Sequence, residues 1–234
     1  MIVITLVAVA VSFTVSASAG LGGSLILVPT LALVLGTKEG VALAALLLAA
    51  NNVVKVFAYR ETLPYRKAQV VIVLVAVGAG LGARLLVAAP ERVVTIAVIV
   101  SFVLALIAER LDLSRLRKAG GPLLAFGSGA TSGFSGTSGP LKGMAIRQLD
   151  LDRAHFVGAA SLVSLVGDAT KTAVFTEAGL LGGASYMIAL AAAPLMIIAT
   201  VTGRRINREI GERGYTRLFW GVMAGYTLRL VLSM

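Results

Sequence analysis

Residues 133–142 read GFSGTSGPLK. The three glycines and three hydroxyl side chains at 133–139 separate two apolar stretches, 121–131 and 140–149. As a helix, the stretch after the glycines covers only about 15 Å, half of the roughly 30 Å hydrocarbon core of a bilayer. Pro140 is suited to the first position of a new helix. The sequence therefore predicts a helix that breaks inside a membrane and begins again.

A similar pattern opens the chain, where residues 2–35 are apolar except for a glycine-rich interruption at 19–23. A shift of 116 residues aligns the two breaks and other positions. The shift pairs Gly20 with Gly136, Gly23 with Gly139, Asn52 with Asp168, Lys55 with Lys171, Tyr59 with Phe175 and Glu61 with Glu177. Six matches in one register predict an internal duplication.

The composition is that of a membrane protein. The 234 residues are 58% hydrophobic and only 14% charged, against about 25% charged in a typical soluble domain, and the mean hydropathy is +0.93. Further apolar runs approach the roughly 17 to 25 residues that cross a bilayer as a helix. These runs are 40–58, 68–83, 93–108, 156–175, 186–203 and 215–232.

The basic residues indicate how the chain is oriented. The net charge is +10, and the lysines and arginines gather in loops, as the positive-inside rule expects. We therefore expect a lipid bilayer as partner and no nucleic acid. The basic loops are 60–67, 110–118, 147–153 and 204–217. All four face the cytoplasm only if each broken segment folds back as a re-entrant hairpin.

That arrangement predicts an all-α fold of two repeats, each with one hairpin and three crossings. Because three is odd, the second repeat is inverted relative to the first, as in many secondary transporters. We expect the first repeat at residues 1–110, a cytoplasmic connection at 111–119 and the second repeat at 120–234. Both termini then lie outside the cytoplasm.

The starts of the two half-helices are candidate solute sites. Backbone N–H groups at a helix N-terminus have no partner within the helix and favour an anion. The residues at these starts are Gly22, Gly23, Ser24, Ser138 and Gly139. The alternative is that the glycines only permit close helix packing, which is the interpretation we prefer for Gly78 and Gly82.

Ionisable residues within the apolar runs are the sharper functional signal. Lys55, Lys142 and Lys171 favour a small anionic solute, with Asn52 beside them, and Asp168 is a candidate proton carrier. Two alternatives stay open: Lys55 reaches the membrane surface, and Asp168 and Lys171, three residues apart, form a structural ion pair. The chain has no cysteine, and we expect neither a cofactor nor a metal.

These motifs resemble the sulfite exporter TauE/SafE family of integral membrane proteins over nearly the whole chain. The resemblance rests on Gly20-Leu21-Gly22-Gly23 with Val28-Pro29, the second break, the repeat layout and the Asn52 helix. It implies transport of sulfite, sulfonates or related organosulfur anions. The chain departs from the usual glycine triplet at Ser24 and at Thr137-Ser138. The solute and the oligomeric state stay open.

Two other functional classes remain as alternatives. Ser135 and His155 lie in segments that look like the Ser and His motifs of rhomboid intramembrane proteases. Such chemistry needs the two side chains within hydrogen-bond contact. A non-transporting membrane scaffold is the other alternative, and solute flux in proteoliposomes discriminates it from a transporter.

Overall fold

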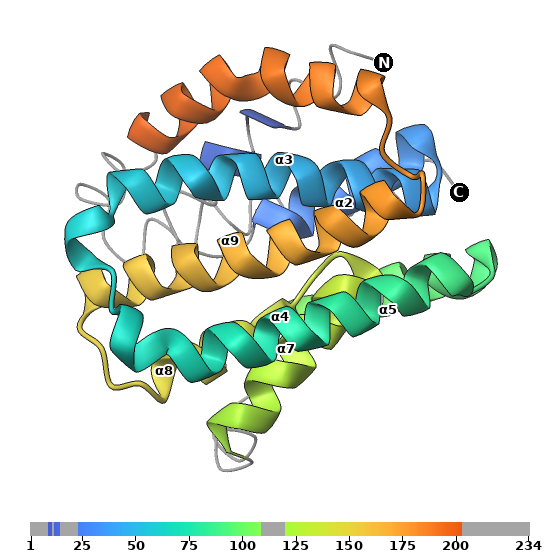
Figure 1. Cartoon of the computed structure of the whole chain (residues 1–234). Helices are drawn as coiled ribbons and strands as arrows, with labels where there is room; N and C mark the ends of the chain where they lie inside the picture. Colours follow the sequence, from blue (N-terminus) through green and yellow to red (C-terminus); the bar gives the residue numbers. More distant parts are fainter. Residues whose placement is uncertain (1–8, 11, 15–22, 109–119, 203–234) are drawn as a thin grey trace.

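The computed structural model describes residues 9–10, 12–14, 23–108 and 120–202, and this part of the chain contains helices and no strand (Figure 1). The elements are α2 (Gly23–Leu35), α3 (Thr37–Ala58), the short 3₁₀ turn η1 (Arg60–Thr62), α4 (Tyr65–Ala88), α5 (Glu91–Ala108), α7 (Gly121–Ser135), α8 (Gly139–Arg147), α9 (Arg153–Glu177) and a final helix, Gly183–Thr202. The all-α prediction is thus confirmed for the described residues.

Five of the six predicted apolar runs fall on described helices; the sixth, 215–232, lies outside the described residues. Each of the five helices begins two or three residues before its run. The early residues are polar, such as Lys38 in α3 and Arg66 in α4. Hydropathy marks where a helix is apolar, so it misses a polar first turn.

Three described helices are long and apolar enough to cross a membrane: α3, α4 and Gly183–Thr202. Large apolar side chains point outward from the bundle, among them Val73 of α4 at 59% exposed and Leu190 of the final helix at 70%. Exposed apolar surface of this extent fits lipid rather than water. The helix α9 has 25 residues, enough to span, but carries Asp168 and Lys171.

The closest helix packing joins α4 to α7 through glycines on both helices. A Cβ at Gly78 or Gly82 would overlap the backbone of Phe126 or Ala130, and one at Gly129 would overlap Val75. Small residues at this spacing let two helix backbones touch. The interpretation of Gly78 and Gly82 as packing residues is confirmed.

The second glycine break is shorter than the sequence predicts. Helix α7 continues through Gly133 and ends at Ser135, and Gly133 packs against the backbone of Ala79. Gly136 then adopts a left-handed conformation with φ 77°, which glycine reaches without steric cost. The interruption is therefore limited to residues 136–138, because Gly133 serves the contact with α4.

Helices α7 and α8 form a hairpin whose two open ends lie together. A Cβ at Gly121, the first residue of α7, would touch the side chain of Gln148, which follows α8. With 15 and 9 residues, the two helices are about 22 and 14 Å long. Both are shorter than the roughly 30 Å hydrocarbon core.

The element boundaries repeat with the shift found in the sequence. Helices α2 and α8 begin at Gly23 and Gly139, and α3 and α9 begin at Thr37 and Arg153, so each pair starts 116 residues apart. Helices α3 and α9 lie side by side and run in opposite directions (Figure 1). The shift of 116 residues thus relates the starts of helices as well as sequence positions, while the duplication and its inversion across a membrane stay predictions.

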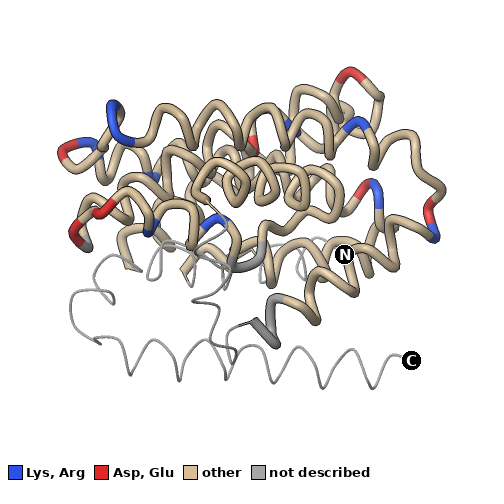
Figure 2. The backbone as a smooth tube through the Cα atoms, turned by 90° about the horizontal axis from the view of Figure 1, so that it is seen from below, with Lys and Arg blue, Asp and Glu red and all other residues tan. Residues whose placement is uncertain are grey.

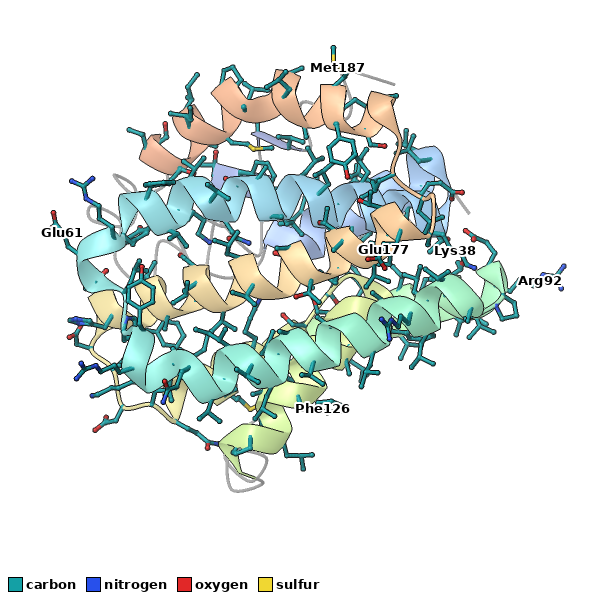
Figure 3. The ribbon with its side chains drawn as sticks, viewed as in Figure 1. Lys38, Glu61, Arg92, Phe126, Glu177 and Met187 are labelled. Atoms are coloured by element: carbon teal, nitrogen blue, oxygen red, sulfur yellow. The ribbon has the colours of Figure 1, made fainter. Side chains whose placement is uncertain are left out.

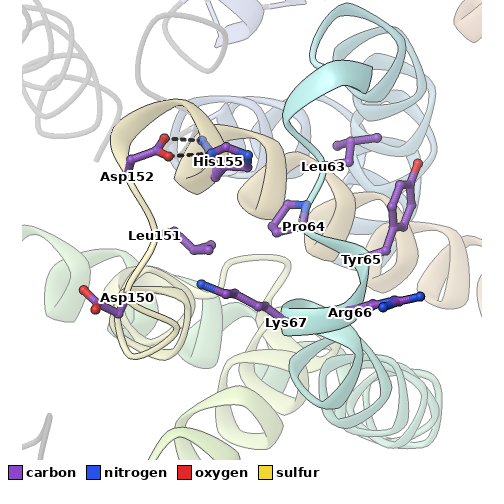
Figure 4. Close-up of a pocket in the computed structure, with 9 residues that line it drawn as sticks. All are labelled: Leu63, Pro64, Tyr65, Arg66, Lys67, Asp150, Leu151, Asp152 and His155. Carbon is purple, nitrogen blue, oxygen red and sulfur yellow. Dashed lines mark hydrogen bonds and ion pairs between the residues drawn. The ribbon is translucent and has the colours of Figure 1, made fainter.

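Charged residues gather toward the two ends of the helices (Figure 2). Glu61 of η1 lies at one end, and Lys38, Arg92 and Glu177 lie at the other (Figure 3). A cavity of about 520 Å³ is lined jointly by residues 63–67, residues 150–152 and His155 (Figure 4). Two of the four basic loops therefore share one end, while 110–118 and 204–217 lie outside the described residues.

Candidate functional site

One face of α3 carries buried polar side chains near the end of the helix. Asn51, Asn52 and Lys55 are 0%, 3% and 1% exposed, whereas Val53 and Phe57 on the opposite face are 41% and 69% exposed. A lysine that reached the membrane surface would expose its ammonium group. The surface alternative for Lys55 is therefore wrong, because the side chain points into the bundle.

Helix α9 brings a carboxylate and a second lysine against this face. Lys171 Nζ lies 2.7 Å from Asp168 Oδ1, and Asn52 Nδ2 donates to Asp168 Oδ2 at 2.8 Å. Lys171 Nζ also donates to Ser132 Oγ of α7 at 2.9 Å. Three helices thus meet in one polar network, and its central amide and carboxylate occupy matched positions of the two repeats.

The pairing explains how these charges are accommodated in an apolar bundle. A buried charge without partners costs roughly several kcal/mol of folding free energy, even after the protein relaxes around it. Here both oxygens of Asp168 accept from donors, and Lys171 has an anionic and a neutral partner. The predicted ion pair between Asp168 and Lys171 is therefore confirmed.

Lys142 is the third cation of the site and has a different environment. It lies in the first turns of α8, and its Nζ donates to Ser164 Oγ of α9 at 2.8 Å. Within the described part of the chain, this neutral hydroxyl is its only polar partner. The charges of Asp168, Lys171 and Lys55 lie within electrostatic range of Lys142, so the three lysines and the carboxylate form one cluster.

The half-helix starts differ slightly from their prediction. Gly23 and Gly139 are the first residues of α2 and α8, so Gly23, Ser24 and Gly139 lie within the first turns and do not precede them. Gly22 lies outside the described residues. Ser138 occupies the cap position of α8, and its side chain makes no capping hydrogen bond.

The second break packs directly on the first repeat. A Cβ at Gly136 would clash with Val28 of α2 and press on Val41 of α3. Ser12 Oγ donates to the carbonyl oxygen of Gly23, which ties residues 12–14 to the start of α2. The second break and the half-helix of the first repeat are therefore neighbours in space.

Four further polar residues belong to this region and were not predicted: Asn51, Ser132, Ser164 and Thr200. Ser132 and Ser164 hold the two lysine ammonium groups, and Thr200 Oγ1 donates to Asn51 Oδ1 at 3.3 Å. A single serine in an apolar helix carries little sequence signal. Only the pairing of helices shows which serines face a lysine.

Ser135 and His155 are not brought together. Ser135 Oγ donates to the carbonyl oxygen of Thr131 at 2.8 Å and is buried. His155 lines the loop cavity, where its Nδ1 contacts Asp152 Oδ2 at 2.6 Å (Figure 4). The geometry gives no support for a Ser–His nucleophile. The cavity, in turn, includes none of the predicted solute residues.

The cluster has the chemistry of an anion site. Ammonium groups, hydroxyls and backbone N–H groups at a helix start all donate to oxyanions. No group of three His, Asp or Glu side chains able to hold a metal occurs among the residues that the structure describes.

Comparison with protein families gives a match over nearly the whole chain. The family model described as "Sulfite exporter TauE/SafE" matches residues 4–230. No curated protein and no solved structure matches the chain.

Proposed function

This chain belongs to the sulfite exporter TauE/SafE family, and we propose that it is a multi-pass secondary transporter of a small anion in the cytoplasmic membrane. The solute class is sulfite, a sulfonate or a related organosulfur anion. The family consists of membrane transporters and not enzymes, which argues against the protease alternative. The solute site that we propose comprises Lys55, Lys142, Lys171 and the start of α8.

The observation that carries the proposal is the partner of Lys142. Its ammonium group donates to the neutral hydroxyl of Ser164, while the carboxylate of Asp168 is already paired with Lys171. An ammonium group in an apolar bundle needs a compensating anion. A solute oxyanion bound by Lys142 supplies that negative charge. It also accepts from the ammonium N–H groups of Lys142 that do not donate to Ser164.

The start of α8 supports the same location. Lys142 lies one turn after Gly139, so its stem begins beside the free backbone N–H groups of the half-helix. The helix dipole adds a partial positive charge at this point. From the repeat register, we also include in the proposed site Gly22, Gly23 and Ser24, at the equivalent position of the first repeat. Asn52 belongs to the site because its side chain donates a hydrogen bond to Asp168.

Asp168 is the candidate for coupling to protons. It takes the place of Asn52 in the repeat register, so one half has a titratable group where the other has an amide. In the described geometry both of its oxygens accept hydrogen bonds. A proton on Asp168 would remove the negative charge that pairs with Lys171 and would weaken the hydrogen bond from Asn52, which would link protonation to the contact of α3 with α9.

We also propose that the repeats are inverted across the membrane, with the loops at 60–67 and 147–153 in the cytoplasm. The antiparallel contact of α3 with α9 supports this arrangement. The natural absence of cysteine makes the test direct. A single Cys at Lys67 should be shielded from an impermeant thiol reagent in intact cells, and a single Cys at Gly182 should be labelled. The reverse pattern contradicts the orientation.

Flux decides between a transporter and a scaffold. Purified protein in proteoliposomes should carry radiolabelled sulfite, or a sulfonate from the same panel, in a saturable manner. Competition within a panel of sulfur oxyanions, sulfonates and carboxylates then ranks the solutes. Absence of flux for every anion tested would leave the scaffold as the better description.

A further inference from the structure

The polar residues of the proposed site are distributed unequally between the two repeats. The shift of 116 residues places Lys142 on Ile26 and Ser164 on Leu48. Both counterparts in the first repeat are apolar and 5% exposed. The lysine–hydroxyl pair beside α8 therefore has no equivalent beside α2, although the two half-helices begin at matched residues.

Thr137 extends this inequality into the break itself. Its side chain is 1% exposed, and its Oγ1 has no hydrogen-bond partner in the described structure. The same shift places Thr137 on Leu21, which has no side-chain donor. Thr137 directly precedes Ser138, the cap residue of α8, so the unpaired hydroxyl lies at the half-helix start nearest Lys142.

A buried hydroxyl without a partner needs an explanation, because nearly all buried polar groups in native proteins are hydrogen-bonded. Other threonines of the bundle satisfy their hydroxyls locally. Thr30 Oγ1 donates to the carbonyl oxygen of Ile26, and Thr170 Oγ1 to that of Val166. Thr137 lies in a helix break, where no carbonyl four residues earlier is available in helical geometry.

We propose that Thr137 is a solute ligand and that the anion is bound by the second repeat's break, with Thr137 Oγ1 donating to a solute oxygen. This deepens the proposed function and rests on it. The donors that the proposal assigns to the solute are the Thr137 hydroxyl, the backbone N–H groups at the start of α8 and the Lys142 ammonium group, all within six residues of one another in the chain. The first repeat then contributes Lys55 of α3, while its own half-helix offers apolar side chains at the positions that match Lys142 and Ser164.

The proposal also assigns a role to the chain's departure from a pure glycine break. Glycine at position 137 would offer only backbone to the solute, whereas threonine adds one directed O–H donor. A donor at a fixed position discriminates among anions by where their oxygens lie. Thr137 is thus a specificity residue for an oxyanion.

The test is Thr137→Val, which keeps the shape of the side chain and removes only the hydroxyl. Sulfite uptake into proteoliposomes gives KM and maximal rate, and thermal unfolding gives stability. Since a hydrogen bond to a charged group is lost, KM should rise about tenfold or more. The unfolding temperature should not fall, because the hydroxyl removed has no partner in the protein.

Two comparisons make the result specific. Thr137→Ser keeps the hydroxyl and should stay within about threefold of wild-type KM, because the loss is less than a full hydrogen bond. Thr30→Val makes the same change in α2, where the hydroxyl bonds its own helix, and should leave KM unchanged. Thr137→Ala replaces Thr137→Val if the valine variant does not fold, with the same expected rise.

A KM within twofold of wild type in a folded Thr137→Val or Thr137→Ala protein overturns the proposal. Equal rises in Thr137→Val and Thr137→Ser also overturn it, because the hydroxyl would then not be the cause. Failure of the wild-type protein to transport any anion is a different outcome. It rejects the proposed function itself and, with it, this site.

Discussion

Two helix contacts in this bundle show opposite solutions to close packing. Between α4 and α7, glycines at Gly82 and Gly129 bring backbones into direct contact without side-chain chemistry. Between α3 and α9, Asn52, Asp168 and Lys171 meet through hydrogen bonds and an ion pair. The first contact is suited to a fixed unit. The second depends on charge and protonation, so it is the contact that a solute or a proton can change.

The two contacts also differ in what the sequence reveals. Glycine spacing of four residues on α4 predicts the close packing, but Gly133 looks like part of a break until α4 is seen beside it. Ionisable residues in apolar runs predict the α3–α9 site, and the repeat register places Asn52 and Asp168 at matched positions. Their direct contact follows only when the two helices are packed together.

The largest expected effect comes from opening the charged contact with Lys171→Ala. The change leaves a buried carboxylate without its cation, which costs about 3 to 5 kcal/mol of folding free energy. Lys55→Ala on α3 is the matched variant, because position 52 is an amide and not a carboxylate, and it should cost less. Thermal or denaturant unfolding measures both. Equal losses would mean that the ion pair is not what distinguishes α9 from α3.

Lys171→Ala should also weaken solute binding in protein that still folds. Loss of a charged hydrogen bond is worth about 1 to 3 kcal/mol. Lys171→Arg should do less harm, although its planar guanidinium group differs in shape from an ammonium group. Solute affinity unchanged in folded Lys171→Ala protein removes Lys171 from the site.

The glycine contact is tested by Gly82→Ala. A Cβ there overlaps the carbonyl oxygen of Ala130, so the helices must separate, at a cost of about 1 to 3 kcal/mol for an overpacked interface. Gly80→Ala on the same helix is the control, because its Cβ would lie at an ordinary 3.4 Å from Thr170. Equal unfolding temperatures for the two variants would show that α4 and α7 do not depend on close backbone contact.

Asp168→Asn tests, in protein that still folds, whether the α3–α9 contact moves protons. The variant makes the two repeats alike at this position. Proton-driven solute accumulation in proteoliposomes should be lost, while exchange of solute across the membrane survives because it needs no net proton movement. Accumulation that persists in Asp168→Asn ends the proton-carrier role. Damage to binding at every pH indicates that Asp168 serves only to pair with Lys171.

A sharper version moves the carboxylate from one repeat to the other. Asn52→Asp combined with Asp168→Asn places the acid on α3, beside Lys55, and leaves the amide on α9. Gradient-driven accumulation should return at least in part, because the donor–acceptor pair is only reversed. Continued loss in a folded double variant would show that the carboxylate works only from α9.

The smallest effect is expected at the starts of α3 and α9, outside the polar network. Asp152 caps α9. A hydrogen bond from the backbone N–H of His155 is the main cause that holds the pKa of the Asp152 carboxyl below its usual range, and a hydrogen bond with the His155 side chain is the second cause. The stabilisation is therefore present above about pH 4 and is lost as the pH falls through the folded pKa. Helix α3 has Gly36 at its cap position, and its first turn is held instead by Glu91 of α5, whose carboxylate accepts from the backbone N–H groups of Thr37 and Lys38 at 2.7 and 3.2 Å.

Amide hydrogen exchange measures the contribution of Asp152. The first turn of α9 should lose protection at acidic pH, and the first turn of α3, which is held by Glu91, should not respond to Asp152→Asn. Asp152→Asn should reduce the pH dependence in α9, because an amide can still cap without titrating. The same acid-induced loss in Asp152→Asn would assign the effect to another group, such as the neighbouring His155.

The sequence alone does not show which helices pack against each other. It predicted the helices, the second break and all three lysines, because long apolar runs and charges within them are strong signals. It missed Ser132, Ser164 and Thr137, whose roles depend on which helix lies opposite. It also left Lys55 undecided, since a lysine near the end of a run can point either to the surface or into the bundle.

The most direct test of the central claim is the KM for sulfite transport in proteoliposomes containing wild-type protein, Lys142→Gln or Lys67→Gln. If Lys142 holds the solute, wild-type flux is saturable, and Lys142→Gln raises KM by about tenfold or more, the effect of losing a charged hydrogen bond. Lys67 is an exposed lysine in the first turn of α4, so Lys67→Gln should match wild type. Equal KM values for all three proteins would contradict an anion site built on the buried lysines.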